Sequence, residues 1–291
     1  MKIAAFDIGG TALKMGVVTE KGDILTKAKQ DIPHFSGEKI LAGLLAWLET
    51  HPDCGGIAVS APGYVNPHTG FITMGGAIRD FDHSHLQAWL SQKTALPVTV
   101  ENDANCALLA ERWLGKARSM SDFLMMTIGT GIGGAIFCNG ALVHGHRFSA
   151  GEFGYRLNER PRADRLMKYT LHEICTLTVL RGRYAAHSGK TLEEVSGEEI
   201  FEKYDRGDSV CTSLVTQFFQ DICAGIFNLS HIFDPECIFP GGGITERPQF
   251  IDEVKEYLDR YGIPAEVTKA QHGNSAGLPG AVYHFISSQH E

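Results

Sequence analysis

Four polar residues lie together where a predicted strand meets a predicted helix. Residues 98–113 read VTVENDANCALLAERW, in which Glu101, Asn102, Asp103 and Asn105 separate a β-branched run from a run of strong helix formers. Asn and Asp are preferred helix caps because their oxygens accept hydrogen bonds from the free N–H groups of the first turn. One residue is enough for a cap. Polar side chains beyond the carboxyl end of a strand are also typical of ligand sites in open α/β sheets, so both interpretations stay open.

Three glycine-rich turns follow predicted strands and are candidates for binding phosphate. They cover residues 9–11, 129–134 and 241–243. Glycine lets the backbone approach a phosphate closely and direct consecutive N–H groups at it. Each turn taken alone is equally well explained as an ordinary tight turn.

Two better-known nucleotide motifs fit poorly. The sequence SGKT at 188–191 lacks the earlier glycine of a P-loop and follows no predicted strand. Residues 129–134 match G-x-G-x-x-G, but that fingerprint must open a helix. Residues 135–138 instead read as a strand that ends in the turn Asn139-Gly140. A Rossmann dehydrogenase therefore remains only a minor alternative.

The elements that position these residues alternate between strands and helices. Residues 2–8 and 13–19 predict a hairpin, and DIGGT at 7–11 and TIGTG at 127–131 share a strand-turn-strand plan that indicates a duplication. The alternation predicts an α/β protein with two lobes. We expect further strands at 56–60, 98–100, 123–128, 135–138 and 237–239, and helical segments at 38–50, 81–93, 106–113, 169–186, 196–204, 209–233, 249–261 and 279–287.

Composition excludes several classes of protein. The 291 residues carry a formal net charge of −8, which argues against nucleic acid and anionic membranes as partners. No apolar run approaches the length of a membrane span and the start lacks a signal-peptide core, so we expect no membrane and a cytoplasmic location. Seven scattered cysteines without a C-x-x-C pair predict reduced, mostly buried thiols.

Four stretches together resemble the ROK family of sugar kinases and repressors. They are DIGGT at 7–11, ENDAN at 101–105, TIGTGIGG at 127–134 and PGGGI at 240–244, while AGEFG at 150–154 is similar to the family's E-x-G-H sugar-binding segment. The match covers nearly the whole chain in the right order. It implies an α/β, actin-like (ribonuclease-H-like) duplicated fold, with ATP and a sugar bound in the cleft between two lobes.

The resemblance also implies a role for each matching residue. Asp103 would be the catalytic base, Asn102 would bind sugar hydroxyls, and Glu152 would bind the sugar ring. Asp7 would approach a Mg²⁺ ion, usually through water. The loops would contact ATP, with Gly9, Gly10, Thr11, Thr130, Gly131 and Gly133 by the phosphates and Gly241, Gly242 and Gly243 by the adenosine.

The chain also departs from the family pattern. Tyr155 stands where the family usually has histidine, and the cysteine-rich zinc segment that normally follows is missing. Cys175 could be its remnant; the glutamate usually two residues later is then replaced by Leu177, and Tyr155 or Glu173 could supply the lost sugar contacts. We therefore expect no structural zinc. Zinc-free members include β-glucoside kinases, which indicates transfer to O6 of a β-glucoside such as cellobiose, or of a hexose.

Other functions remain as alternatives. The chain could be an N-acetylmannosamine kinase or a glucokinase of the same family. A sugar-responsive repressor would carry a helix-turn-helix domain, for which the first strand at Lys2 leaves no room. An actin-like assembly protein would not need both Asp7 and Asp103. The resemblance further implies a homodimer, and we expect lobes at 1–117 and 118–278, with the helix at 279–291 packing back on the first.

Overall fold

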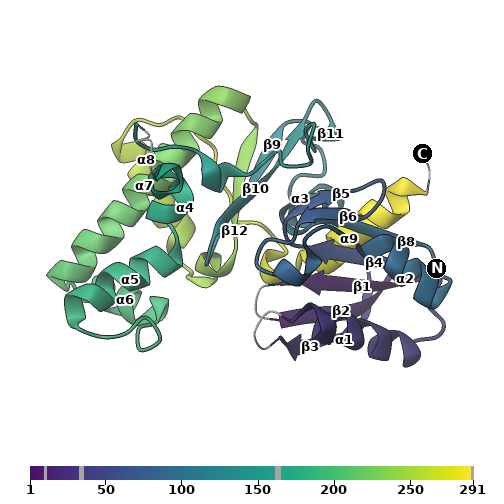
Figure 1. The fold of residues 1–291 in the computed structure, drawn as a ribbon. Helices are drawn as coiled ribbons and strands as arrows, with labels where there is room; N and C mark the ends of the chain where they lie inside the picture. Colours follow the sequence, from purple (N-terminus) through teal and green to yellow (C-terminus); the bar gives the residue numbers. More distant parts are fainter. Residues whose placement is uncertain (10–11, 33–35, 161–164, 290–291) are drawn as a thin grey trace.

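The first lobe of the protein is built on a five-stranded sheet (Figure 1). The structure is a computed structural model that describes residues 1–9, 12–32, 36–160 and 165–289. Strand order is β3-β2-β1-β4-β8; β1, β2 and β3 form antiparallel pairs, whereas β4 and β8 run parallel to β1. The bounds are β1 Lys2–Ile8, β2 Ala12–Thr19, β3 Ile24–Asp31, β4 Gly56–Ala61 and β8 Val98–Asn102, with a small sheet of β5 Tyr64–Asn66, β6 Phe71–Met74 and β7 Ser84–His85 between β4 and β8 in the chain.

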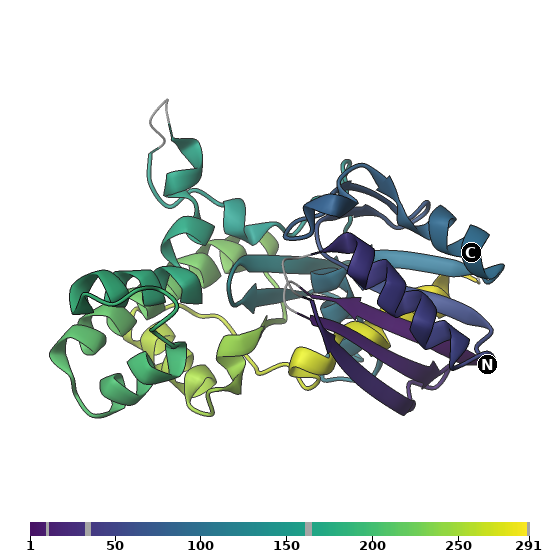
Figure 2. The same cartoon turned by 60° about the horizontal axis from the view of Figure 1, so that its bottom comes forward.

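Helices cover both faces of this sheet (Figure 2). Alternate residues of a strand point to opposite faces, so Ala4 and Phe6 of β1 pack in one cluster with Ile40 and Leu44 of α1, while Ile3 packs in another with the C-terminal helix. Asp7 is four residues after Ile3 in the same strand, so its side chain points to the same face. It therefore lies on the face covered by the C-terminal helix. The helices are α1 Gly37–Glu49 and α2 Leu86–Thr94 on one face, and α3 Asp103–Trp113 and α9 Gly277–Ser288 on the other.

The second lobe repeats the plan of a hairpin followed by a parallel strand. Its sheet has the order β11-β10-β9-β12; β9 and β10 are antiparallel, and β12 runs parallel to β9. The strands are β9 Phe123–Ile128, β10 Ile132–Cys138, β11 Ala141–Leu142 and β12 Cys237–Gly241. The helices, toward the left in Figure 1, are α4 Leu171–Ile174, α5 Leu177–Ser188, α6 Gly197–Asp205, α7 Ser209–Phe233 and α8 Phe250–Arg260.

Helix α3 connects the two sheets. It contacts β4 and β8 in the first lobe, β9 and β10 in the second, and α9. Its Leu108 and Leu109 share a buried cluster with Phe123 and Phe239 of the second sheet. The strand-to-helix junction at the start of α3 therefore lies between the lobes.

Most of the expected elements are confirmed, with three local corrections. The helix predicted at 81–93 begins only at Leu86, after a 3-10 turn and β7. The segment predicted helical at 169–186 is broken before Thr176, whose side chain caps α5 by accepting a hydrogen bond from Val179 N. Gly133 and Gly134, predicted in a loop, belong to β10. Glycine is needed at 134 for packing, because a Cβ there would lie 2.2 Å from the Phe153 ring.

Helix α7 is long and apolar enough to span a membrane by length and composition. Nine of its residues, including Phe218, Phe219 and Ile222, are however buried in the core of the second lobe. It is therefore a core helix. All seven cysteines are unpaired, and all but Cys138 are buried, as predicted.

Candidate functional site

The carboxyl ends of three parallel strands bring polar side chains into line. Asp7 of β1 pairs in register with Ser60 of β4, which pairs with Glu101 of β8. Asp7 is 7% exposed; its two oxygens accept hydrogen bonds from Ser60 Oγ at 2.8 Å and from Lys14 Nζ at 2.9 Å. Ser60 and Lys14 were not among the site residues predicted from the sequence. A lysine in the apolar run of β2 and a serine that ends a buried strand were the available signals.

The polar residues at the start of α3 have different roles: one caps the helix, and the next leaves its carboxylate exposed. Strand β8 extends to Asn102, which is the helix cap: its Oδ1 accepts hydrogen bonds from Ala104 N and Asn105 N at 2.9 and 3.0 Å. Its amide also donates to Gly63 O at 2.9 Å. Asp103 is the first helical residue and is exposed. Capping by Asn102 thus leaves the Asp103 carboxylate at the surface between the lobes.

Glu101, by contrast, is fully buried and structural. Its Oε1 accepts hydrogen bonds from Asn102 N at 2.7 Å and Asn105 Nδ2 at 3.0 Å, and its Oε2 lies 2.7 Å from His144 Nε2. Burial acts to raise the pKa of Glu101, but the hydrogen bond from His144 and the charge of His284 outweigh it, and the pKa lies below its ordinary value. Glu101 therefore stabilises the junction between β8 and α3 through buried hydrogen bonds.

Carboxyl groups of both lobes lie near enough to the junction to affect one another's pKa. Although part of the Asp103 surface is exposed, desolvation by the surrounding protein atoms, and next the negative charge of Asp7, raise the pKa of Asp103 to about 6. Burial and the charge of Asp103 raise the pKa of Glu152 to about 7. Because α3 starts in the first lobe and Glu152 belongs to the second, the two carboxyl groups come from opposite sides. Perturbed carboxyl pairs of this kind are typical of catalytic sites.

Two tyrosines adjoin this carboxyl cluster. Burial, then the charge of Glu152 and the neighbouring Tyr155 hydroxyl, raise the pKa of Tyr64 to about 12. Tyr64 lies on β5 of the first lobe, and Tyr155 ends a 3-10 turn, Phe153–Tyr155, of the second. Tyr155 is 41% exposed. The structure thus places predicted Tyr155 beside Glu152 and adds Tyr64, which no sequence motif indicated. Glu173 is exposed on α4.

The glycine turns of the second lobe meet at one edge of its sheet. Gly241 pairs in register with Thr127, so the turns after β9 and β12 are neighbours. Gly242 has a φ of 87°, and a Cβ on it would lie 2.5 Å from Ile128 O, so this position requires glycine. Thr130 is exposed, and a Cβ on Gly131 would lie 2.9 Å from the His172 ring.

Some of the predicted phosphate contacts are already hydrogen bonded within the chain. Gly133 N donates to Thr127 Oγ1 at 3.2 Å, and Gly9 N donates to Ala12 O at 3.0 Å. Gly10 and Thr11 lie outside the described residues. The N–H groups of Gly9 and Gly133 therefore have protein acceptors in this conformation.

A hollow of about 310 Å³ adjoins the third glycine turn. Gly243, Ile244, Leu177, Phe201 and Arg247 are among its lining residues. Arg247 is fixed there by a two-fold hydrogen bond to Asp205, at 2.7 and 3.0 Å, and its guanidinium lies 4.8 Å from the Phe201 ring centroid. Glu198, Glu202, Asp205 and Glu246 also line this hollow. Its apolar surface, from Leu177, Ile244 and the Phe201 ring, suits a flat heteroaromatic base.

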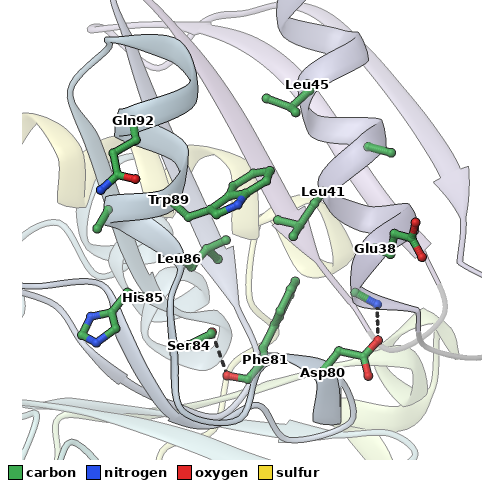
Figure 3. Close-up of a pocket in the computed structure, with 13 residues that line it drawn as sticks. Glu38, Leu41, Leu45, Asp80, Phe81, Ser84, His85, Leu86, Trp89 and Gln92 are labelled. Atoms are coloured by element: carbon green, nitrogen blue, oxygen red, sulfur yellow. Dashed lines mark hydrogen bonds between the residues drawn. The ribbon is translucent and has the colours of Figure 1, made fainter.

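A larger cavity of about 760 Å³ lies between α1 and α2, away from these residues (Figure 3). Leu41 and Leu45 of α1 face Trp89 of α2 across it, and Asp80 holds the start of α1 by accepting a hydrogen bond from Gly37 N at 2.8 Å. None of the predicted site residues lines it. Size alone does not identify the functional site.

A structural zinc site and a magnesium site make different demands on the residues present. Within the described parts of the chain, no three or more His, Cys, Asp or Glu side chains are grouped as metal ligands. Cys175 is fully buried, and His172 faces Gly131 and Ile132 instead. Mg²⁺ keeps most of its waters and needs only one or two carboxylates besides the phosphates, which Asp7 could provide.

Comparisons with known proteins give a consistent result. A family model described as ROK family matches residues 3–287. The β-glucoside kinase of Klebsiella pneumoniae is 57% identical over 98% of this chain and 96% of its own length. The structure of a Listeria monocytogenes protein, described as a candidate N-acetylmannosamine kinase, has a TM-score of 0.96 at 57% identity and covers 99% of this chain and 100% of its own. A Streptomyces griseus ROK glucokinase with bound glucose and AMPPNP has a TM-score of 0.81 at 26% identity, covering 97% and 98%.

Proposed function

Because the chain belongs to the ROK family, we propose that it is an ATP-dependent kinase that phosphorylates a β-glucoside, at O6 of the sugar. The similarity to β-glucoside kinases over nearly the whole length of both chains carries this proposal. The grouping of Asp7, Asp103 and Glu152 between the lobes supplies the chemistry that phosphoryl transfer requires. That chemistry is mainly positioning and neutralisation of charge.

In the proposed mechanism Asp103 accepts the proton of the attacking sugar hydroxyl. A pKa of about 6 keeps it ionised at neutral pH and more basic than an ordinary aspartate. Asn102 contributes the second N–H of its amide to a sugar hydroxyl, while its oxygen continues to cap α3. Glu152, with a pKa of about 7, exchanges hydrogen bonds with the ring hydroxyls, and Tyr155 borders the same side.

ATP would bind along the glycine turns of both lobes. The turns containing Gly9, Gly10 and Thr11, and Thr130, Gly131 and Gly133, would surround the phosphates, and those N–H groups not already bonded would contact them. Gly241, Gly242 and Gly243 would border the adenosine, with the base in the hollow beside Gly243 and Arg247. A Mg²⁺ ion held near Asp7, through water, would neutralise phosphate charge.

The acceptor sugar is tested by a coupled ADP-release assay. We expect kcat/KM for cellobiose and gentiobiose to exceed that for glucose, N-acetylmannosamine and fructose. Glucose and N-acetylmannosamine represent the two alternatives suggested by similar structures. If kcat/KM for either monosaccharide equals or exceeds that for cellobiose, the β-glucoside assignment is wrong, although the kinase assignment stands.

We further propose a homodimer and a cytoplasmic location. Phe227 and Ile232 on α7 and Tyr261 after α8 are 44, 67 and 46% exposed, and Phe227 and Tyr261 border a hollow of about 410 Å³. An apolar hollow bordered by exposed aromatic side chains is a candidate subunit interface. The use of ATP and the seven unpaired thiols fit a reducing compartment. Light scattering of the purified protein at micromolar concentration measures the oligomeric state.

A further inference from the structure

A cavity of about 770 Å³ lies behind the catalytic junction. Its walls come from α2, β8, α3, the segment after β10 and α9, so it includes residues of both lobes and of the C-terminal helix. It shares no residue with the predicted sugar or ATP sites. This volume falls in the range of small-molecule sites.

The walls carry an arginine, three histidines and several hydroxyl groups. His68, Arg112, His144 and His284 line the cavity, and none of the described lining residues is Asp or Glu. Ser91, Ser287 and Ser288 add hydroxyls. Glu101 is buried behind this wall, 2.7 Å from His144 and 3.9 Å from His284. Arg112 is therefore the permanent charge that the described lining residues offer to an anion.

Buried polar atoms of the walls have no hydrogen-bond partner within the protein. Thr99 is only 7% exposed, and its Oγ1 has no acceptor or donor; the same holds for Gln87 Oε1 and Arg112 Nε. Buried polar groups are nearly always satisfied in native structures. Arg112 is meanwhile fixed in place by its hydrogen bond to the Arg118 carbonyl and by the Phe137 ring, 5.5 Å from the guanidinium.

We propose that this cavity is a second ligand site, which binds a phosphorylated sugar. Arginine and histidine recognise the phosphate, and the unpartnered Thr99 hydroxyl and Gln87 carbonyl recognise sugar hydroxyls. The choice of a sugar phosphate, the chemical class of the product, rests on the proposed function. His144 joins the cavity wall to the catalytic junction, since it is hydrogen bonded to Glu101.

Calorimetric titration of the full-length protein with glucose 6-phosphate tests the site without turnover. We expect Arg112→Gln to weaken binding by about tenfold or more, the effect of losing a charged hydrogen bond. Thr99→Val, which removes a hydroxyl that has no protein partner, should weaken it about threefold and leave the fold intact. The matched control is Arg79→Gln, an equal charge change at a residue that is 68% exposed outside the cavity.

The outcomes separate this site from the proposed function. Unchanged glucose 6-phosphate affinity in both Arg112→Gln and Thr99→Val overturns the site, whatever sugar the enzyme phosphorylates. Inorganic phosphate binding as tightly as glucose 6-phosphate overturns the assignment of the sugar moiety. If the ADP-release screen shows no kinase activity but binding still depends on Arg112 and Thr99, the site stands and the proposed function falls.

Discussion

At the scale of single residues, the junction before α3 uses one residue to cap the helix and another to present a carboxylate between the lobes. A single aspartate could have done both. Asn102 caps the helix, and Asp103 keeps its carboxylate at the surface between the lobes. An amide is the better cap here, because a carboxylate at 102 would add a third negative charge beside Asp7 and Asp103. The neighbouring Glu101 is buried, and hydrogen bonds from Asn102 N and Asn105 Nδ2 and the contact with His144 stabilise its carboxylate.

Asp103→Asn should abolish phosphoryl transfer while the protein still folds and binds ATP. The amide is a poor proton acceptor, and the helix keeps its cap because Asn102 is unchanged. Steady-state assays should show a loss of about 10²- to 10⁴-fold in kcat. Asp53→Asn, at a carboxylate 57% exposed that pairs with Lys2, is the control and should retain full activity. Retention of more than about a tenth of the wild-type rate in Asp103→Asn would refute the base assignment.

The raised pKa of Asp103 predicts a pH dependence of activity. Since the ionised form is the base, kcat should fall about tenfold per pH unit below about pH 6. A rate that stays level down to about pH 5 would contradict this role.

The same pKa predicts an effect on stability. Its folded value lies above the ordinary 3.8, so ionisation of Asp103 destabilises the folded protein as the pH rises from about 4 through 6. Asp103→Asn should therefore have a higher Tm than wild type at about pH 8, and this difference should shrink toward about pH 4. Thermal unfolding followed by circular dichroism measures this difference. A lower Tm for Asp103→Asn than for wild type at about pH 8 would show that the folded protein stabilises the ionised carboxylate.

At the scale of elements, α9 completes the site from the far end of the chain. Gly277 begins this helix, and a Cβ on it would lie 2.2 Å from Asp7 Cγ. The Asp7 carboxylate thus leaves no room for a side chain at Gly277, although the two residues are 270 positions apart in the sequence. Gly280 similarly allows α9 to approach α3, since its Cβ would lie 1.8 Å from Cys106 O.

Gly277→Ala should reduce both stability and activity. The added methyl displaces Asp7 or α9, and overpacking of this kind costs about 1–3 kcal/mol in the free energy of unfolding. The matched control is Gly182→Ala in α5, where the methyl meets open space and should stabilise the helix by up to about 1 kcal/mol. Urea unfolding and kcat are measured for both. Equal stability of the two variants would show that α9 adjusts without affecting Asp7.

At the scale of the whole molecule, two lobes, each built on a sheet of similar plan, lie on either side of the carboxyl groups that we propose as the site. Asp7 and Asp103 come from the first, and Glu152 and the glycine turns at 129–131 and 241–243 from the second. We propose lobes at 1–117 and 118–278, with the C-terminal helix predicted at 279–291 packing on the first; residues 290 and 291 lie outside the described part of the chain. Such an arrangement lets closure of the lobes exclude water from the reacting groups.

The whole enzyme should require magnesium and contain no structural zinc. Tyr155, His172 and Cys175 are not grouped as ligands, so dialysed protein should contain well under one zinc per chain. EDTA should stop turnover and added Mg²⁺ should restore it, without a change in Tm, because magnesium acts on ATP and not on the fold. Stoichiometric zinc that survives dialysis would contradict this account of the second lobe.

The sequence alone was sufficient for the alternation of elements, the hairpins that begin each lobe, and the family. These features rest on local periodicity and on contiguous motifs such as ENDAN and PGGGI, which are properties of neighbouring residues. It also placed Asp7 and Asp103 at strand ends. Since parallel strands present their carboxyl ends at one edge, such residues could be expected to meet.

Only the tertiary structure decided which polar side chains contact one another. Lys14 and Ser60 bind Asp7, His144 binds Glu101, and Tyr64 lies by Tyr155, although no motif relates these residues. The cavity behind the junction likewise collects residues from both lobes and from α9. Lys14 faces Asp7 directly across the predicted hairpin. The other contacts depend on how sheets and helices pack across long separations in the chain. Side-chain packing of that kind leaves no periodic signal in a sequence.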